Sequence, residues 1–203
     1  MPKISAVFCD VGGVLLTNGW GHAERARLVE QFGLDGADFD ARNQMVSAAF
    51  DAGQLDIDQY LDRTIFYRPQ SFRKQEVRDF MYAQSEALPD SLALIGRLAQ
   101  AGKVFLATLN NESRELNLHR IEKFGLRTHF SAFFSSCYLG VSKPHPQIYR
   151  MALDISQRQP EECVFIDDRS LNLECARRLG IHTIQFLNAG QMEDDLCRLG
   201  VEA

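Results

Sequence analysis

The sequence predicts an α/β fold in which helices cover both faces of a mostly parallel sheet. Short apolar runs that end at a polar residue alternate along the chain with helical patterns that stop at glycine. Strands that are joined through helices form right-handed crossovers, which build a parallel sheet between two helical layers. Residues 17–88 break the alternation because they contain only helical patterns. We therefore expect a sheet domain of residues 1–16 and 89–203, interrupted by an all-helical domain of residues 17–88.

The expected strands are short apolar runs that are bounded by turn signals. The first covers residues 4–9 and stops at Asp10, just before the tight turn Gly12-Gly13. Continuous apolar runs of this kind are typical of strands that are buried on both faces. The later candidates cover residues 104–107, 163–166 and 182–187, with a weaker one at 132–134.

The helical patterns between these runs have recognisable ends. Asp90 or Ser91 is the expected N-cap of a helix that stops before Gly102. Pro146 suits the first turn of another helix, because its fixed φ angle is helical. Glycine also closes the apolar stripes at 118–124 and 171–179, and the insertion contains helical patterns at 26–32, 38–51, 57–66 and 73–87.

Composition and charge exclude several classes of protein. The chain of 203 residues has a net charge of -5 and no block of Lys and Arg, which argues against binding to nucleic acid. No apolar run approaches the ~20 residues that a bilayer span requires, and the first residues lack a signal-peptide pattern. Five scattered cysteines without a Cys-x-x-Cys pair are typical of reduced thiols. We therefore expect a cytoplasmic protein with neither a membrane nor a nucleic acid as partner.

Polar residues follow three of the expected strands at their carboxyl ends, where ligands bind in open α/β sheets. They are Asp10, Thr108 and the pair Asp167-Asp168. Two carboxylates ~4 Å apart repel by roughly 4 kcal/mol at an effective dielectric constant of 20, so such a cluster needs a cation or protons. Carboxylate oxygens favour Mg²⁺. Lys143, in a loop with two prolines, and the Thr108 hydroxyl would then bind the oxygens of a phosphate group.

Four segments of the chain resemble, in the correct order, the motifs of the haloacid dehalogenase superfamily. The second and third motifs are matched by Ala107-Thr108 and by Ser142-Lys143-Pro144. The first is matched by Phe8-Cys9-Asp10-Val11-Gly12-Gly13-Val14-Leu15, and the fourth by Phe165-Ile166-Asp167-Asp168 with Asn172. The insertion matches the helical cap that this family places after its first motif. The pattern is similar to small bacterial sugar-phosphate phosphatases, of the α-D-glucose-1-phosphate type, and to the phosphatase domain of soluble epoxide hydrolase.

The resemblance implies a Rossmann-like core and a Mg²⁺-dependent phosphatase that acts on a small-molecule phosphate monoester, such as a sugar phosphate. It implies that Asp10 is the nucleophile and forms an aspartyl phosphate. It also implies that Thr108 and Lys143 bind phosphate, with Lys143 steadying the carboxylates. The metal ligands that it implies are Asp10, the main-chain carbonyl of Gly12, and Asp168, with Asp167 either a ligand or beside the ligands. The oligomeric state is open between monomer and homodimer.

Two positions depart from the family pattern. Gly12 stands where most phosphatases of the family have a second Asp as general acid and base, a group that typically contributes about 10²- to 10⁴-fold in rate. Its absence favours substrates with a good leaving group. Leu109 replaces the Asn that usually follows the Ser or Thr of the second motif, so Asn110 or Asn111 is the expected substrate contact.

Several alternatives remain open at this stage. Trp20 lies where the chain enters the insertion and either packs or gates the substrate, and His22 is a candidate for the missing acid. A metal-independent 2-haloacid dehalogenase also lacks the second Asp. The Asp167-Asp168 pair argues against it, because uncompensated carboxylates would repel a carboxylate substrate. The third function is a phosphate- or Mg²⁺-binding module with little catalytic activity.

Overall fold

Five parallel strands form one sheet in the computed structural model, which describes residues 3–202. The first two residues, part of the segment that lacks a signal-peptide pattern, lie outside the described residues. The strands are β1 (Ala6–Cys9), β2 (Phe105–Asn110), β3 (Ala132–Ser135), β4 (Cys163–Asp167) and β5 (His182–Gln185). Their order is β3-β2-β1-β4-β5, and each neighbouring pair is parallel. The predicted α/β fold class is therefore confirmed.

The strand order reverses at β1, which pairs with β2 on one side and with β4 on the other. Cys9 is paired with Thr108 of β2 and with Ile166 of β4. The Asp10 main-chain amide extends the second pairing by donating to the Ile166 carbonyl at 2.9 Å. The carboxyl ends of these three strands therefore meet at one edge of the sheet, and an edge where the strand order reverses is where α/β sheets bind ligands.

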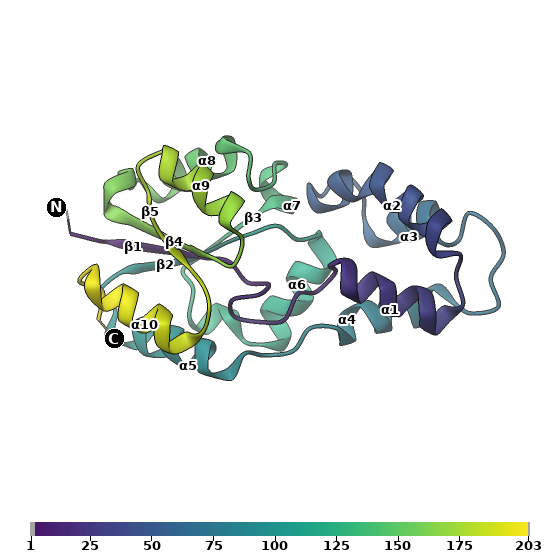
Figure 1. Ribbon diagram of the computed structural model, residues 1–203, viewed down its shortest axis with the longest axis horizontal. Coiled ribbons are helices and arrows are strands. Elements are labelled where there is room, and N and C mark those ends of the chain that lie inside the picture. Colours follow the sequence, from purple (N-terminus) through teal and green to yellow (C-terminus); the bar gives the residue numbers. More distant parts are fainter. Residues whose placement is uncertain (1–2, 203) are drawn as a thin grey trace.

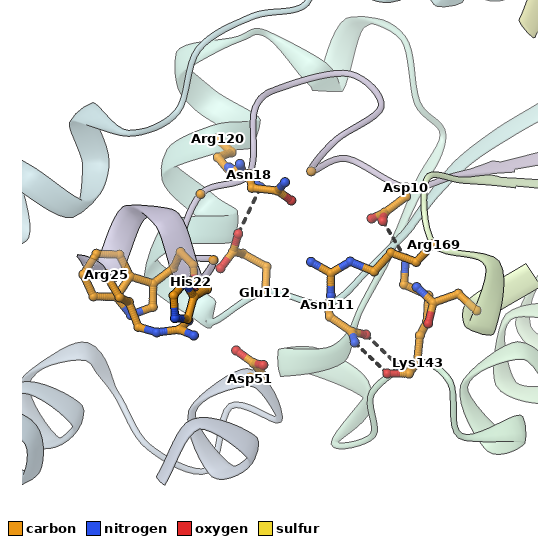
Figure 2. Close-up of a pocket in the computed structure, with 15 residues that line it drawn as sticks. Asp10, Asn18, His22, Arg25, Asp51, Asn111, Glu112, Arg120, Lys143 and Arg169 are labelled. Atoms are coloured by element: carbon orange, nitrogen blue, oxygen red, sulfur yellow. Dashed lines mark hydrogen bonds and ion pairs between the residues drawn. The ribbon is translucent and has the colours of Figure 1, made fainter. Parts of the chain in front are cut away.

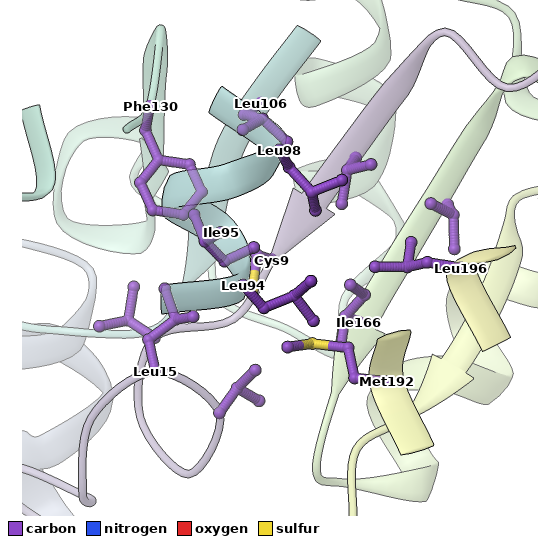
Figure 3. Packing of buried hydrophobic residues seen from close by; sticks show 14 of the residues in the cluster. Cys9, Leu15, Leu94, Ile95, Leu98, Leu106, Phe130, Ile166, Met192 and Leu196 are labelled. Carbon is purple, nitrogen blue, oxygen red and sulfur yellow. The ribbon is translucent and has the colours of Figure 1, made fainter. Parts of the chain in front are cut away.

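Helices cover both faces of the sheet, and each face has its own hydrophobic core (Figure 1). One core contains Cys9 and Ile166 from the strands and Met192 from the last helix, as Figure 3 shows. The other contains Phe8 and Phe165, which point to the opposite face. The helices of the sheet domain are α5 (Pro89–Ala101), α6 (Arg114–Lys123), α7 (Ser136–Leu139), α8 (Pro146–Ser156), α9 (Ser170–Arg178) and α10 (Ala189–Arg198), with 3₁₀ turns at Leu126–Thr128 and Pro160–Glu162.

The insertion forms four helices around a separate hydrophobic cluster, at the far end of the molecule from both termini (Figure 1). Leu28, Phe50, Leu61 and Met81, one from each helix, are buried in this cluster. Leu116 of α6 joins them, so the insertion rests on a helix of the sheet domain. The helices are α1 (His22–Phe32), α2 (Gly36–Asp51), α3 (Ile57–Thr64) and α4 (Lys74–Ala83). This arrangement supports a division of the chain near residues 17 and 88.

Local sequence explains most helix ends. Gly33 and Gly102 follow α1 and α5 in the left-handed conformation, which glycine adopts without a steric penalty. The predicted N-cap of α5 at Asp90 or Ser91 is wrong. The helix begins instead at Pro89, because the fixed φ of proline suits the first helical position.

Three other features differ from the sequence-based expectations. β2 continues to Asn110, beyond the polar residue at which the apolar run ends. Leu118 is 39% exposed, because α6 turns Leu116 toward the insertion instead. The sequence pattern does not predict α10, whose fully buried apolar side chains are Met192 and Leu196, one turn apart.

The two segments that join the insertion to the sheet domain lie side by side. The Thr17 amide donates to the Glu86 carbonyl at 2.9 Å, and the Glu86 amide donates to Thr17 Oγ1 at 3.0 Å. Arg120 of α6 holds both segments, because its guanidinium donates to the Thr17 carbonyl and, at 3.0 Å, to Ser85 Oγ. This arginine is almost completely buried. A single side chain of the sheet domain therefore ties down both ends of the insertion.

Gly53, in the loop after α2, packs closely against Cys137 of the sheet domain. Its φ is 69°, and a Cβ atom there would collide with the Cys137 carbonyl of α7. We expect Gly53→Ala to lower the free energy of unfolding by more than the roughly 1–2 kcal/mol that alanine loses in a left-handed conformation.

The matched control for Gly53→Ala is Gly102→Ala, which has a φ of 62° and no atom within 4 Å of an added Cβ. Urea denaturation of both variants separates the backbone cost, which they share, from the collision, which only Gly53→Ala introduces. Equal losses of stability in the two variants would contradict the close contact at Gly53.

Candidate active site

A cavity of about 370 Å³ separates the carboxyl edge of the sheet from the insertion (Figure 2). Both parts of the chain contribute to its wall. The sheet domain provides Asp10, Gly12, Asn111, Glu112, Arg120, Lys143, Arg169 and Asn172. The insertion and the segment before it provide Asn18, Gly19, Trp20, Gly21, His22, Arg25 and Asp51. The structure thus brings Asp10, Gly12, Asn111 and Lys143 of the predicted site into one cavity.

Lys143 bridges two of the carboxylates that the sequence analysis selects. Its Nζ lies 3.0 Å from Asp10 Oδ2 and 2.7 Å from Asp167 Oδ2, and its side chain is 1% exposed. Burial raises the pKa of the Asp10 carboxyl, and the ammonium group of Lys143 opposes that rise. Because an unpaired buried carboxylate costs several kcal/mol, the lysine is what allows two carboxylates to lie together at this edge.

Asp167 is held by hydrogen bonds on both of its oxygens. Asn172 Nδ2 lies 3.0 Å from each oxygen, and the Arg169 main-chain amide donates to Oδ1 at 2.8 Å. Lys143 Nζ completes the set at Oδ2. With both oxygens occupied, Asp167 is well placed to orient Lys143 and poorly placed to release an oxygen to another partner.

Asp168 has an oxygen without a partner. Its Oδ1 is buried and accepts no hydrogen bond. Burial, and then the neighbouring Asp167, raise the pKa of this carboxyl. Gly13 makes room for it, because a Cβ at Gly13 would lie 2.5 Å from Asp168 Oδ2, and the φ of Gly13 is 78°. Gly13, the second glycine of the first motif, is therefore favoured for two reasons. Its backbone is left-handed, and the Asp168 carboxylate leaves no room for a side chain.

Two of the three carboxylates, those of Asp10 and Asp168, are donors that fit a hard divalent cation, and Asp167 lies beside them. One oxygen of each of the three residues lies within 4.8 Å of the other two. Lys143 balances only part of their negative charge. The orphaned Asp168 Oδ1 marks where a further positive partner would bind. Oxygen donors of this kind suit Mg²⁺, so the residues present fit the metal that the sequence analysis expects.

Asn111 holds the loop that carries Lys143. Its Oδ1 accepts a hydrogen bond from the Lys143 amide, and its Nδ2 donates to the Lys143 carbonyl, both at 2.8 Å. This side chain also lines the cavity. The two hydrogen bonds show in addition that it fixes the backbone from which the lysine reaches Asp10.

Thr108 and Asn110, also expected to contact substrate, are not among the residues that line the cavity. Thr108 is paired with Cys9, so its side chain shares the face of the sheet that Cys9 occupies, and its hydroxyl is buried without a partner. Asn110 is hydrogen-bonded to Asn117 at 3.1 Å and to Ser135 at 2.9 Å. β2 continues past Thr108 to Asn110, so both side chains follow the alternation of a strand.

The insertion supplies the opposite wall of the cavity. Trp20 Nε1 donates to the Tyr60 hydroxyl at 2.9 Å, so this Trp packs within the insertion and also faces the cavity. Arg25 donates to the Trp20 carbonyl at 2.6 Å. Burial raises the pKa of Asp51 to about 6, against the lowering effect of Arg25 and Arg169. The wall opposite the carboxylates therefore carries charges of both signs.

Sequence reasoning missed five charged residues of the wall, one of which is Arg120, buried on α6. Arg169 directly follows the fourth motif, and Glu112 directly follows the two candidate asparagines, so adjacency was an available signal for both. Arg25 and Asp51 lie within helices of the insertion, where the local pattern does not distinguish them from solvent-exposed charges. Only the placement of the insertion over the sheet brings these two residues to the site.

The parallel sheet, its acidic edge and the helical insertion after its first strand define a capped α/β fold. The family model of the haloacid dehalogenase-like hydrolases matches residues 4–180. The chain belongs to the haloacid dehalogenase-like hydrolase family, and the resemblance that its motifs indicate is confirmed.

The chain is similar to proteins of several functions. It is 28% identical to flavin mononucleotide hydrolase 1 of Arabidopsis thaliana over 162 residues, which cover 80% of this chain and 65% of that protein. It is 46% identical to bifunctional epoxide hydrolase 2 of Sus scrofa over 59 residues, which cover 29% of this chain and 11% of that protein. The chain thus spans less than two thirds of the length of these curated relatives.

A solved structure shares the fold. A HAD-family enzyme of Bacteroides thetaiotaomicron, determined in complex with magnesium and inorganic phosphate, has a TM-score of 0.75 and 19% identity to this chain. The match covers 92% of this chain and 96% of that one. The likeness therefore includes the insertion as well as the sheet.

Two further observations concern the whole described chain. Within residues 3–202, no helix combines the length and the apolarity that crossing a membrane would require. All five cysteines are free thiols, and Cys9 is buried in the core as the strand alternation predicts.

Asp51 should make stability depend on pH. Its folded pKa of about 6 exceeds the ordinary value of 3.8, so ionisation costs folding energy that grows from about pH 4 to pH 6 and persists above. We expect Asp51→Asn to stabilise the protein by roughly 2–3 kcal/mol at pH 7.5 and hardly at pH 4. Chemical denaturation at both pH values measures this difference. The control is Asp40→Asn, an exposed carboxyl on the same helix, and a stabilisation by Asp51→Asn that is the same at both pH values would refute the assignment.

Proposed function

We propose that the protein is a Mg²⁺-dependent phosphatase that hydrolyses a small-molecule phosphate monoester through an aspartyl phosphate on Asp10. The observation that carries this proposal is the cluster of buried Asp10 and Lys143 with half-buried Asp168 at the edge of the cavity. Membership of a hydrolase family supports it, as does the solved relative that binds magnesium and phosphate.

Asp10 is oriented for nucleophilic attack. Its Oδ1 accepts a hydrogen bond from the Val11 amide at 2.7 Å, and its Oδ2 faces Lys143 at 3.0 Å. These contacts fix the rotamer and leave the carboxylate open to the cavity, where it would attack phosphorus in line with the leaving oxygen. Lys143 would bind a phosphate oxygen and offset the charge that the dianion brings to this acidic edge.

The metal ligands in this proposal are the Asp10 carboxylate, the Gly12 carbonyl and Asp168, with Asp167 beside them. When bound there, Mg²⁺ supplies positive charge to the phosphate oxygens. The role of Asp167 is then to hold Lys143, because its own oxygens are already occupied by Lys143, Asn172 and the main chain.

The cavity supports a polar substrate of modest size, such as a sugar phosphate. At about 370 Å³ it is small, and it presents the donors and acceptors of Asn18, Arg25, Asp51 and Arg169 to the part of the substrate beyond the phosphate. Hydroxyl groups can both donate to Asp51 and accept from the arginines. The free thiols support the cytoplasm as the compartment.

The dehalogenase alternative is less well supported by the site. A 2-haloacid carries a carboxylate, which would have to approach Asp10 beside Asp167 and Asp168 with only Lys143 as a compensating charge in their cluster. A phosphate ester brought in with a divalent cation does not meet this difficulty. The binding-module alternative predicts metal or phosphate binding without turnover.

Substitution of Asp10 tests the nucleophile. We expect Asp10→Asn to lose more than about 10³-fold in phosphate release from sugar phosphates and from p-nitrophenyl phosphate, because the amide cannot form the acyl phosphate. Asp154→Asn, an exposed carboxyl on α8, is the matched control. Removal of Mg²⁺ by a chelator should abolish activity, and added Mg²⁺ should restore it. Undiminished release by Asp10→Asn, or full activity in chelator, would refute the proposal.

A further inference from the structure

A carboxyl group lies beside the guanidinium group that a side chain at position 12 would also approach. A Cβ atom added to Gly12 would lie 3.3 Å from Asn18 Oδ1 and 3.5 Å from Arg120 Nη1. The same Nη1 lies 3.0 Å from Glu112 Oε2. Glu112 and the missing side chain therefore share one neighbouring guanidinium group. In Figure 2, Glu112 lies in the same cavity as Asp10, between Asp10 and the residues of the insertion.

The surroundings of Glu112 hold its carboxyl in place. Oε1 accepts a hydrogen bond from the Ser113 amide at 3.2 Å, Oε2 faces Arg120, and the Glu112 amide donates to Ser136 Oγ at 3.0 Å. The residue is 6% exposed, and it lines the cavity. Burial raises the pKa of Glu112 to about 7, with Arg120 lowering it and Asp51 raising it further. A general acid works best with a pKa near the operating pH.

We propose that Glu112 is the general acid and base of this site, in place of the Asp that position 12 lacks. The inference rests on the proposed phosphatase function. When Asp10 attacks phosphorus, the bond from phosphorus to the ester oxygen breaks, and Glu112 gives its proton to that oxygen, so that a neutral alcohol leaves. When water attacks the aspartyl phosphate, Glu112 takes a proton from the water, the phosphorus–Asp10 bond breaks, and inorganic phosphate forms.

The other titratable groups of the cavity are less well placed for this proton. Asp51 lies on the insertion, where Arg25 and Arg169 are its charged neighbours. His22 begins α1 on the same wall. Glu112 belongs to the sheet domain, as Asp10 does, so the distance between them does not depend on how the insertion moves.

The test compares leaving groups in Glu112→Gln, which keeps the shape of the side chain. We expect kcat/KM on a primary-alkyl phosphate to fall about 10²- to 10⁴-fold, because that leaving group needs a proton. The first turnover of p-nitrophenyl phosphate should change little, since p-nitrophenolate leaves unprotonated. The second step should then be slow, so that p-nitrophenolate appears in a burst equal to the amount of enzyme. Glu122→Gln, an exposed residue of α6, is the matched control.

A rescue variant separates catalysis from a structural role. We expect Gly12→Asp in the Glu112→Gln background to regain at least tenfold of the lost alkyl-phosphatase activity, because it returns a carboxyl to the same region. If Glu112→Gln does not fold, the same ratio of leaving groups is measured in Glu112→Gln with Arg120→Gln, which removes both charges of the buried pair together. Equal losses on the alkyl and aryl esters, or no loss, would overturn the inference.

The two proposals fail in different ways. Wild-type protein that releases no phosphate from any ester with Mg²⁺ present would overturn the proposed function, and the inference with it. Wild-type activity that depends on Asp10, combined with an unchanged preference between alkyl and aryl esters in Glu112→Gln, would overturn only the role of Glu112.

Discussion

The pairing of Lys143 with two buried carboxylates is the interaction on which the rest of the site depends. Asp10 and Asp167 come from neighbouring strands, and the register of β1 with β4 forces them together at one edge. Without a buried cation between them, their repulsion and desolvation would oppose the closing of that edge. Asn111 clamps the lysine backbone, and the Phe165 ring lies 5.1 Å from the ammonium group. The hydrogen bonds to its main chain and the packing of Phe165 thus both position the ammonium group of Lys143.

Helix α6 connects the parts of the molecule that must act together. Leu116 on this helix packs into the hydrophobic cluster of the insertion, and Arg120 binds both segments that lead to it. The same arginine reaches Glu112 in the cavity wall. A shift of α6 would therefore change both the packing of the insertion around Leu116 and the position of the Arg120 charge in the cavity. The site is composed of a sheet edge and a wall that α6 helps to position.

The sequence predicts the sheet, the insertion and the acidic cluster, because each leaves a local signal. Asp10 and Asp168 follow apolar runs, and parallel strands bring such ends together whatever the intervening chain does. Thr108 shows the limit of this argument. A polar residue inside an apolar run does not say whether the strand has ended. β2 continues for two more residues, and the Thr108 side chain shares the face of the sheet on which Cys9 lies.

The wall of the cavity was beyond sequence reasoning for a different reason. Arg25 and Asp51 have the helical spacing of ordinary surface charges, and their function depends on how one domain is placed on another. Glu112 is buried beside Arg120, a partner that lies on another element, α6. Contacts between different elements determine where these three side chains lie. The residue pattern along a single helix or loop does not predict such contacts.

The hydrogen bonds between Thr17 and Glu86 have a consequence for how the insertion can vary. The chain leaves the sheet domain and returns to it at neighbouring residues. The end of β1 and the start of α5 therefore keep their positions whatever sequence lies between them. In the proposed phosphatase, a change in the insertion would alter the wall that faces the substrate and would leave the carboxylates of the sheet edge in place.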